Sequence, residues 1–218
     1  HDCGKGIGIV ATNGGSIRDY GGVERSSKAM PPFIAVNTTA GTASEMTRFC
    51  IITDTSRKVK MAIVDWRVTP NVAIDDPLLM VGMPPALTAA TGMDALTHAI
   101  EAYTATVAEP LADAAALYAI ELITAYLKTA VFDGSNLEAR AGMLLGSLLA
   151  GIGFSHSDVA AVHCIAEALG GKYDAPHGVC NAVVLPEIMA YNLESCQTRY
   201  ARIAAAMGVN VEDIEEGA

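Results

Sequence analysis

Residues 91–103 read TGMDALTHAIEAY, and this stretch decides how the second half of the chain folds. Its apolar residues recur with helical spacing, which predicts a helix with one buried face. Asp94 and His98 stand four residues apart, so both side chains project from the same face of that helix. A carboxylate and an imidazole one turn apart form a chelating pair for a divalent metal ion.

A second pair of candidate ligands lies further along, in VHCIAEALGGKYDAPHGVCNAV at 162–183. His163 falls in a helical pattern, whereas His177 lies on a predicted turn that could bring its ring back toward the first pair. Three neutral imidazoles and one carboxylate would leave a divalent ion with a net charge near plus one, so it would stay Lewis acidic. Spacing alone also fits separate core histidines, each hydrogen-bonded to a neighbour, and both interpretations stay open at this point.

The sequence changes character at about residue 76. Before it, short β-rich runs alternate with Gly and Pro turn signals, and we expect strands at 33–36, 49–53, 60–64 and 72–74. After it the pattern is helical, and we expect helices at about 85–105, 111–131, 137–154, 158–170, 178–192 and 196–207. The sequence therefore predicts the last part of an α/β domain over 1–76, followed by part of an all-helical domain over 77–218.

Composition restricts the classes of function. The 218 residues are 51% hydrophobic, and 14 Lys and Arg against 24 Asp and Glu give a net charge of -10, so a nucleic-acid partner is not expected. Five cysteines without a C-x-x-C pair fit reduced thiols in a cytoplasm. The most apolar stretch, 143–154, is too short to span a bilayer, and we expect no membrane partner. Because the chain opens with HDCGKGIG, which looks like a binding loop, we expect an internal segment of a longer protein.

Three blocks of the sequence resemble the iron-containing, group III alcohol dehydrogenases and follow that family's order. They are NTTAGTASEMTRFCIITD at 37–54, DDPLLMVGMPPALTAATGMDALTHAIEAY at 75–103 and HCIAEALGGKYDAPHGVCNAVVLP at 163–186. The resemblance extends over essentially the whole chain, which covers a little more than half of a typical member. It implies the dehydroquinate synthase-like fold of that family, with 1–76 from the α/β NAD(P)-binding domain and 77–218 from the helical metal-binding domain.

The resemblance also implies a reaction. It places the metal ligands at Asp94, His98, His163 and His177, the set already singled out by its chemistry. It implies hydride transfer between a small primary alcohol, diol or aldehyde and the nicotinamide of NAD or NADP, in a cleft between the two domains. The donor set suits Fe²⁺, Zn²⁺ and Mn²⁺ comparably, and iron is the family's usual metal. A homodimer is expected on the same ground.

Cofactor contacts follow from the resemblance as well. The loop at 38–42 is implied to touch the nucleotide, although its residues alone fit an ordinary loop, with Thr42 and Glu45 as a helix capping box. Lys60 is implied to contact the ribose, and Leu87 to form a wall near the nicotinamide. Asp2 and Lys5 match the end of the family's phosphate loop. The implied cofactor-binding residues are Asp2, Lys5, Thr38, Thr39, Thr42, Lys60 and Leu87.

One position departs from the family pattern. Many members carry a second histidine four residues after the third ligand, often proposed to transfer protons, and this chain has Glu167 there. A carboxylate can also relay protons if burial raises its pKa, so Glu167 is the candidate catalytic residue. Two alternative functions remain: a glycerol-dehydrogenase-like zinc enzyme, and a catalytically incomplete metal-binding fragment.

Overall fold

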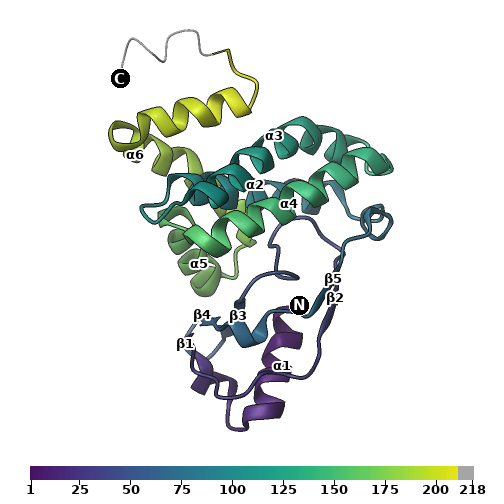
Figure 1. Ribbon diagram of the computed structural model, residues 1–218, viewed down its shortest axis with the longest axis vertical. Coiled ribbons are helices and arrows are strands. Elements are labelled where there is room, and N and C mark those ends of the chain that lie inside the picture. The colour runs from purple at the N-terminus through teal and green to yellow at the C-terminus, as the bar shows by residue number, and fades with distance from the viewer. Residues whose placement is uncertain (211–218) are drawn as a thin grey trace.

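The computed structural model describes residues 1–210, and its secondary structure changes from mixed to helical along the chain (Figure 1). Strands occur only as far as Ile74 in this described part, and the first long helix after them begins at Pro85. The predicted fold class, an α/β portion followed by a helical one, is therefore confirmed. A domain boundary at residue 76 stays a prediction.

The α/β part holds two small sheets. Strands β3 and β4 form an antiparallel hairpin, in register from Phe49 opposite Val64 to Asp54 opposite Val59, and β1 runs parallel to β4. Strands β2 and β5 pair in parallel. The elements of this part are α1 (Asp2–Asn13), η1 (Ile17–Tyr20), β1 (Gly22–Val23), β2 (Ile34–Val36), β3 (Phe49–Asp54), β4 (Val59–Val64), η2 (Trp66–Val68), β5 (Val72–Ile74) and η3 (Pro77–Met80).

The first residues of the chain form a helix, and the prediction of a loop there was wrong. Helix α1 runs from Asp2 to Asn13, and its glycines make room for close neighbours, since a Cβ at Gly4 would lie 2.9 Å from the Phe33 ring. Lys5 is fully buried, and its Nζ donates to the carbonyl oxygens of Thr47 and Phe49. Those bonds anchor α1 to the start of β3.

The helical part contains five long helices within the described residues. They are α2 (Pro85–Thr104), α3 (Pro110–Phe132), α4 (Leu137–Ser157), α5 (Ala161–Tyr173) and α6 (His177–Ala206). The break expected between helices at 192 and 196 lies at Cys196, whose backbone is non-helical (φ −126°, ψ 15°) inside α6. The core of this part includes Ala99, Tyr103, Ile120, Ile123, Met143 and Phe154.

Two of these helices, α3 and α4, are long and apolar enough to cross a membrane by length and composition alone. The apolar stretch at 143–154 was judged from the sequence too short to span a bilayer, but the whole helix α4, Leu137–Ser157, passes the test of length and composition. In α4, 61% of the most apolar window is buried inside the protein, against 33% in α3. The apolar surface of α4 is largely explained by its central place in the helical core.

The two parts of the chain touch where α5 packs on β4. Gly170 and Gly171, near the end of α5, lie against the strand, and a Cβ at Gly171 would stand 3.0 Å from the Lys58 carbonyl oxygen and from the Lys60 amide nitrogen. A side chain there would push the helix away from the strand. This close approach places Lys60 of β4 beside α5, the helix whose third residue is His163.

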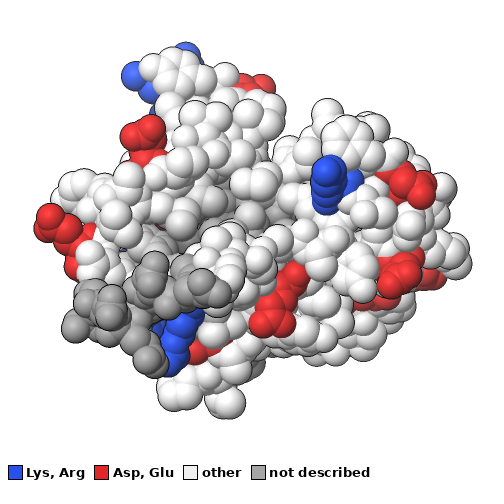
Figure 2. Space-filling model, turned by 90° about the horizontal axis from the view of Figure 1, so that it is seen from above, with Lys and Arg blue, Asp and Glu red and all other residues white. Residues whose placement is uncertain are grey.

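Charged groups are scattered over the face of the molecule shown in Figure 2. Lysine and arginine side chains stand apart from one another there, and much of the visible surface is uncharged. The excess of acidic residues is therefore spread rather than gathered on this face.

Candidate metal centre

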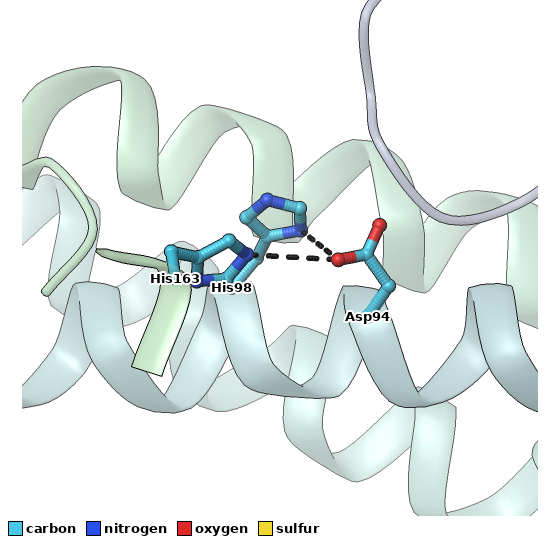
Figure 3. A group of neighbouring side chains, drawn as sticks. All are labelled: Asp94, His98 and His163. Atoms are coloured by element: carbon cyan, nitrogen blue, oxygen red, sulfur yellow. Dashed lines mark ion pairs between the residues drawn. The ribbon is translucent and has the colours of Figure 1, made fainter. Parts of the chain in front are cut away.

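Helix α2 supplies two of the predicted ligands. It starts at Pro85, where a missing backbone N–H costs nothing because the first helical N–H groups have no helical partner. Asp94 and His98 lie on its buried face, only 2% and 6% exposed. Figure 3 shows Asp94 and His98 on this helix, with His163 approaching from a neighbouring segment.

Helices α5 and α6 supply the other two predicted ligands from their first turns. His163 is the third residue of α5, and His177 is the first residue of α6, directly after Pro176. The start of α6 presses on α2, because a Cβ at Gly178 would lie 2.1 Å from the Ala90 carbonyl oxygen. Only glycine permits this contact, which brings His177 to the Asp94 side of α2.

The three histidine side chains converge on one carboxylate oxygen of Asp94. The distance to Asp94 Oδ1 is 3.8 Å from His98 Nδ1, 3.6 Å from His163 Nε2 and 3.4 Å from His177 Nε2. Ligand atoms of Asp94, His98 and His163 all lie within 4.8 Å of one another. Two atoms bonded to one tetrahedral ion at about 2.1 Å stand roughly 3.4 Å apart, so this spacing matches a coordination shell.

Unused hydrogen-bonding capacity also fits a metal ion. His98 Nδ1, the nitrogen that faces Asp94, is buried and has no hydrogen-bond partner among residues 1–210. A buried polar nitrogen left in this state is costly unless another group binds it. The donor set of three imidazoles and one carboxylate is one that Fe²⁺, Zn²⁺ and Mn²⁺ accept.

Protonation in the cluster leaves one carboxylate among imidazoles of differing basicity. Burial alone would raise the pKa of Asp94, but its imidazole neighbours, His98 foremost, hold it well below its usual range. Burial lowers the pKa of His98 to about 3 and also lowers the pKa of His177. Burial opposes protonation of His163 too, but hydrogen bonds to Asp94 and Glu101 outweigh it and raise its pKa to about 9.

Two residues at this centre were not predicted from the sequence. Asn181 is fully buried, and its Nδ2 donates to Asp94 Oδ1 at 2.7 Å and lies 3.2 Å from His163 Nε2. Glu101 is 3% exposed and contacts His163 Nδ1 at 2.5 Å. Helical spacing could have found both, since Asn181 is four residues after His177 and Glu101 is three after His98.

A cleft of about 290 Å³ opens beside the cluster, with walls from both parts of the chain. Side chains from the helical part include His98, His163 and His177, and Phe154 stacks on the His98 ring at 4.3 Å. The lining residues are Asp2, Thr42, Ser44, Thr47, Phe49, Ile51, Thr53, Lys60, His98, Phe154, Val159, His163, Glu167 and His177. The cleft is thus apolar along β3 and polar at the histidines.

Three of the seven predicted cofactor residues line this cleft: Asp2, Thr42 and Lys60. The Asp2 carboxylate accepts hydrogen bonds from Ser44 Oγ at 2.5 Å and from the Ile51 amide at 2.9 Å, so it also fixes the loop to β3. Thr42 is exposed, and its hydroxyl accepts a bond from the Ser44 amide. Their contacts with a nucleotide stay predictions.

The other four lie outside the lining of the cleft in the described residues. Lys5 lies on the buried face of α1, Thr38 is exposed and Thr39 is half-buried. Leu87 is 43% exposed on α2, seven residues before Asp94 and so on the same face. The capping-box interpretation was wrong, because no helix follows Thr42: residues 44–46 form a single turn that leads into β3.

Glu167 lies on α5 one turn after His163, and it lines the cleft. Burial raises the pKa of its carboxyl group, and the positive charge of Lys60 partly opposes this rise. The direction is the one that a proton-transferring carboxyl group needs. Its part in catalysis stays a prediction.

The chain belongs to the iron-containing alcohol dehydrogenase family. The model of "Fe-containing alcohol dehydrogenase family, C-terminal" matches residues 88–218, and that of "Iron-containing alcohol dehydrogenase" matches residues 1–77. The prediction from the three sequence blocks is thereby confirmed.

Individual relatives agree with this assignment. The chain is 56% identical to 1,3-propanediol dehydrogenase of Klebsiella pneumoniae over 211 residues, 97% of this chain and 54% of that protein. It is 48% identical to NAD-dependent methanol dehydrogenase of Bacillus methanolicus over 218 residues, 100% of this chain and 57% of that protein. The crystal structure of 1,3-propanediol oxidoreductase matches with a TM-score of 0.94 at 56% identity, over 97% of this chain and 56% of that one. The chain spans about half the length of the curated relatives it matches.

Proposed function

We propose that this chain forms the metal centre and one wall of the cofactor cleft of a metal-dependent NAD(P) alcohol dehydrogenase. The observation that carries the proposal is the convergence of three histidines on the Asp94 carboxylate at the edge of a cleft. Asp94, His98, His163 and His177 would hold the ion, and Fe²⁺ is proposed from the family. When bound, such an ion supplies Lewis acidity that stabilises negative charge on an alcohol oxygen.

The residues of the chain have three further tasks in this proposal. Phe49, Ile51 and Phe154 give the cleft apolar walls, which exclude water from the reacting atoms. Lys60 and Thr42 stand on the α/β side, where they would bind the nucleotide. Glu167, one turn from His163, would hold or release the proton of the alcohol.

We propose a small primary alcohol or diol as the substrate. A cleft of about 290 Å³ is small, and much of it is needed by a nicotinamide ring. The relatives named for 1,3-propanediol and methanol support the same size range. We choose 1,3-propanediol as the test compound, while a cytoplasmic location and a homodimer stay predictions.

The metal centre is tested by replacing Asp94, the one carboxylate among its four proposed ligands. Co²⁺ titration of the 218-residue chain, followed by visible absorption and equilibrium dialysis, should find about one ion per chain. Asp94→Asn should abolish tight binding, because a neutral amide replaces the anionic ligand. Asp174→Asn is the matched control: Asp174 is exposed in a left-handed conformation (φ 55°) that asparagine accepts readily. Undiminished Co²⁺ binding by Asp94→Asn would contradict the proposed centre.

The dehydrogenase reaction is tested separately from metal binding. The Fe²⁺-loaded chain is given NAD⁺ and 1,3-propanediol, and NADH is followed by absorbance and fluorescence. NADH production supports a dehydrogenase formed by the chain itself. Metal binding without any binding of NADH supports the alternative, an incomplete metal-binding fragment, which is favoured by a chain spanning about half of its relatives.

A further inference from the structure

The Glu101 carboxylate lies between two helices and behind the metal centre. It sits on α2, seven residues after Asp94, and is only 3% exposed. Its Oε1 accepts the Val162 amide N–H at 2.7 Å, and its Oε2 lies 2.5 Å from His163 Nδ1 and 3.3 Å from the His163 amide nitrogen. One carboxylate therefore receives three donors from the first turn of α5.

Helix α5 depends on this carboxylate for its N-terminal cap. Its N-cap residue is Ala160, whose side chain makes no capping hydrogen bond to the first amides of the helix. The orphan N–H groups at a helix start need acceptors when they are buried. Glu101 supplies them from another helix, which fixes where α5 begins relative to α2.

The same carboxylate also sets the orientation of the His163 ring. Its 2.5 Å contact with Nδ1 fixes which edge of the ring faces α2 and which edge faces the ligand cluster. The other nitrogen, Nε2, faces Asp94 Oδ1, 3.6 Å away. The Asn181 Nδ2 atom lies 3.2 Å from Nε2 and 2.7 Å from Asp94 Oδ1, so it contacts both of these proposed ligand atoms.

We propose that Glu101 is a positioning residue of the metal centre, which holds the His163 ring in the orientation needed for its Nε2 to bind the ion. This inference rests on the proposed metal centre. A carboxylate behind a histidine ligand fixes its ring and raises its basicity, and losing such a partner weakens metal binding by about 10- to 100-fold.

The test is the Co²⁺ affinity of Glu101→Gln. Glutamine has one acceptor oxygen, so it satisfies either the Val162 amide or His163 Nδ1 and opposes the other with its own N–H. Affinity should fall by about 10- to 100-fold, with a changed Co²⁺ visible spectrum. Glu109→Gln is the matched control, because Glu109 caps α3 through a single bond to the Ala112 amide, which an amide oxygen can replace. That variant should bind Co²⁺ like the wild-type chain.

A double-mutant cycle separates positioning from general stability. In a His163→Ala background, adding Glu101→Gln should cost no further Co²⁺ affinity, since the residue it acts through is gone. A full additional loss there would overturn the proposal, as would wild-type affinity in Glu101→Gln. If Glu101→Gln does not fold by circular dichroism, Glu101→Asp takes its place, with the same expected loss because its shorter side chain cannot reach both groups. A wild-type chain that binds no Co²⁺ would instead overturn the metal centre itself.

Discussion

At the scale of single residues, Asn181 and Glu101 contact the candidate ligands Asp94 and His163 through buried side chains. Asp94 and His98 could be proposed as ligands from the sequence, because they stand four residues apart in a helical pattern and because Asp and His are common metal-ligating residue types. Asn181 and Glu101 are of types that usually lie on the surface, and only the fold shows them buried against Asp94 and His163. Helical spacing places Glu101 near His98 and Asn181 near His177, but their contacts with His163 and Asp94 cross 62 and 87 positions of sequence, so spacing alone does not pair them.

Asp54 gives a prediction about pH. Hydrogen bonds from Ser56 and Arg57 hold the pKa of its carboxyl group well below the ordinary value of 3.8, helped by Arg18. A lowered folded-state pKa stabilises the protein above the unfolded pKa, and this contribution is lost as the pH falls through the folded value. Asp54→Asn should therefore lower the urea midpoint at neutral pH, and its difference from wild type should shrink below about pH 4.

The measurement is a series of urea unfolding curves between neutral and acidic pH. Asp174→Asn removes the same charge from an exposed site and should follow the wild-type curve in shape. A difference between Asp54→Asn and wild type that stays constant on acidification would show that Asp54 acts through packing or hydrogen bonding that does not titrate.

At the scale of elements, strands and long helices were predicted well because their periodicity is local. Helix α1 was missed since three glycines in its first seven residues are weak helix formers and are typical of phosphate loops. Close packing explains these glycines instead, because Gly4 lies against Phe33, Gly8 against Met30 and Gly6 against Ile17. The fold supplies stability that the local preference lacks.

Gly178 gives a prediction about two packed helices. Gly178→Ala puts a methyl group 2.1 Å from the Ala90 carbonyl oxygen, so the start of α6 must move away from α2. Such overpacking typically costs about 1–3 kcal/mol, and His177 moves with it. We expect a lower thermal midpoint together with weaker Co²⁺ binding, measured by circular dichroism and dialysis.

The control for that variant is Gly82→Ala. No atom of residues 1–210 outside its immediate neighbours lies within 4 Å of a Cβ at Gly82, so an added methyl group meets open space. Both variants replace glycine by alanine, and only Gly178→Ala should affect the metal. Equal Co²⁺ affinity in the two variants would argue against His177 as a ligand held by the contact between α6 and α2.

At the scale of the whole molecule, the candidate ligands come from three helices, α2, α5 and α6. An ion bound by all three would stabilise the folded chain by mass action, by about 2.7 kcal/mol at a free concentration 100 times the dissociation constant. Co²⁺ should therefore raise the thermal midpoint of the wild-type chain, and a chelator should lower it again. Asp94→Asn should show neither shift, and a wild-type midpoint indifferent to Co²⁺ would count against a shared site.

Helix α5 is a rigid spacer between the two sides of the cleft. Its first turn carries His163, its last turn carries the glycines that rest on β4, and its 13 residues span about 20 Å. Figure 1 shows α5 close to the β3–β4 hairpin, and Lys60 of β4 lines the same cleft as His98, His163 and His177. A change in the separation of the two cleft walls would therefore require α5 to turn or shift as a whole, because a helix keeps its length.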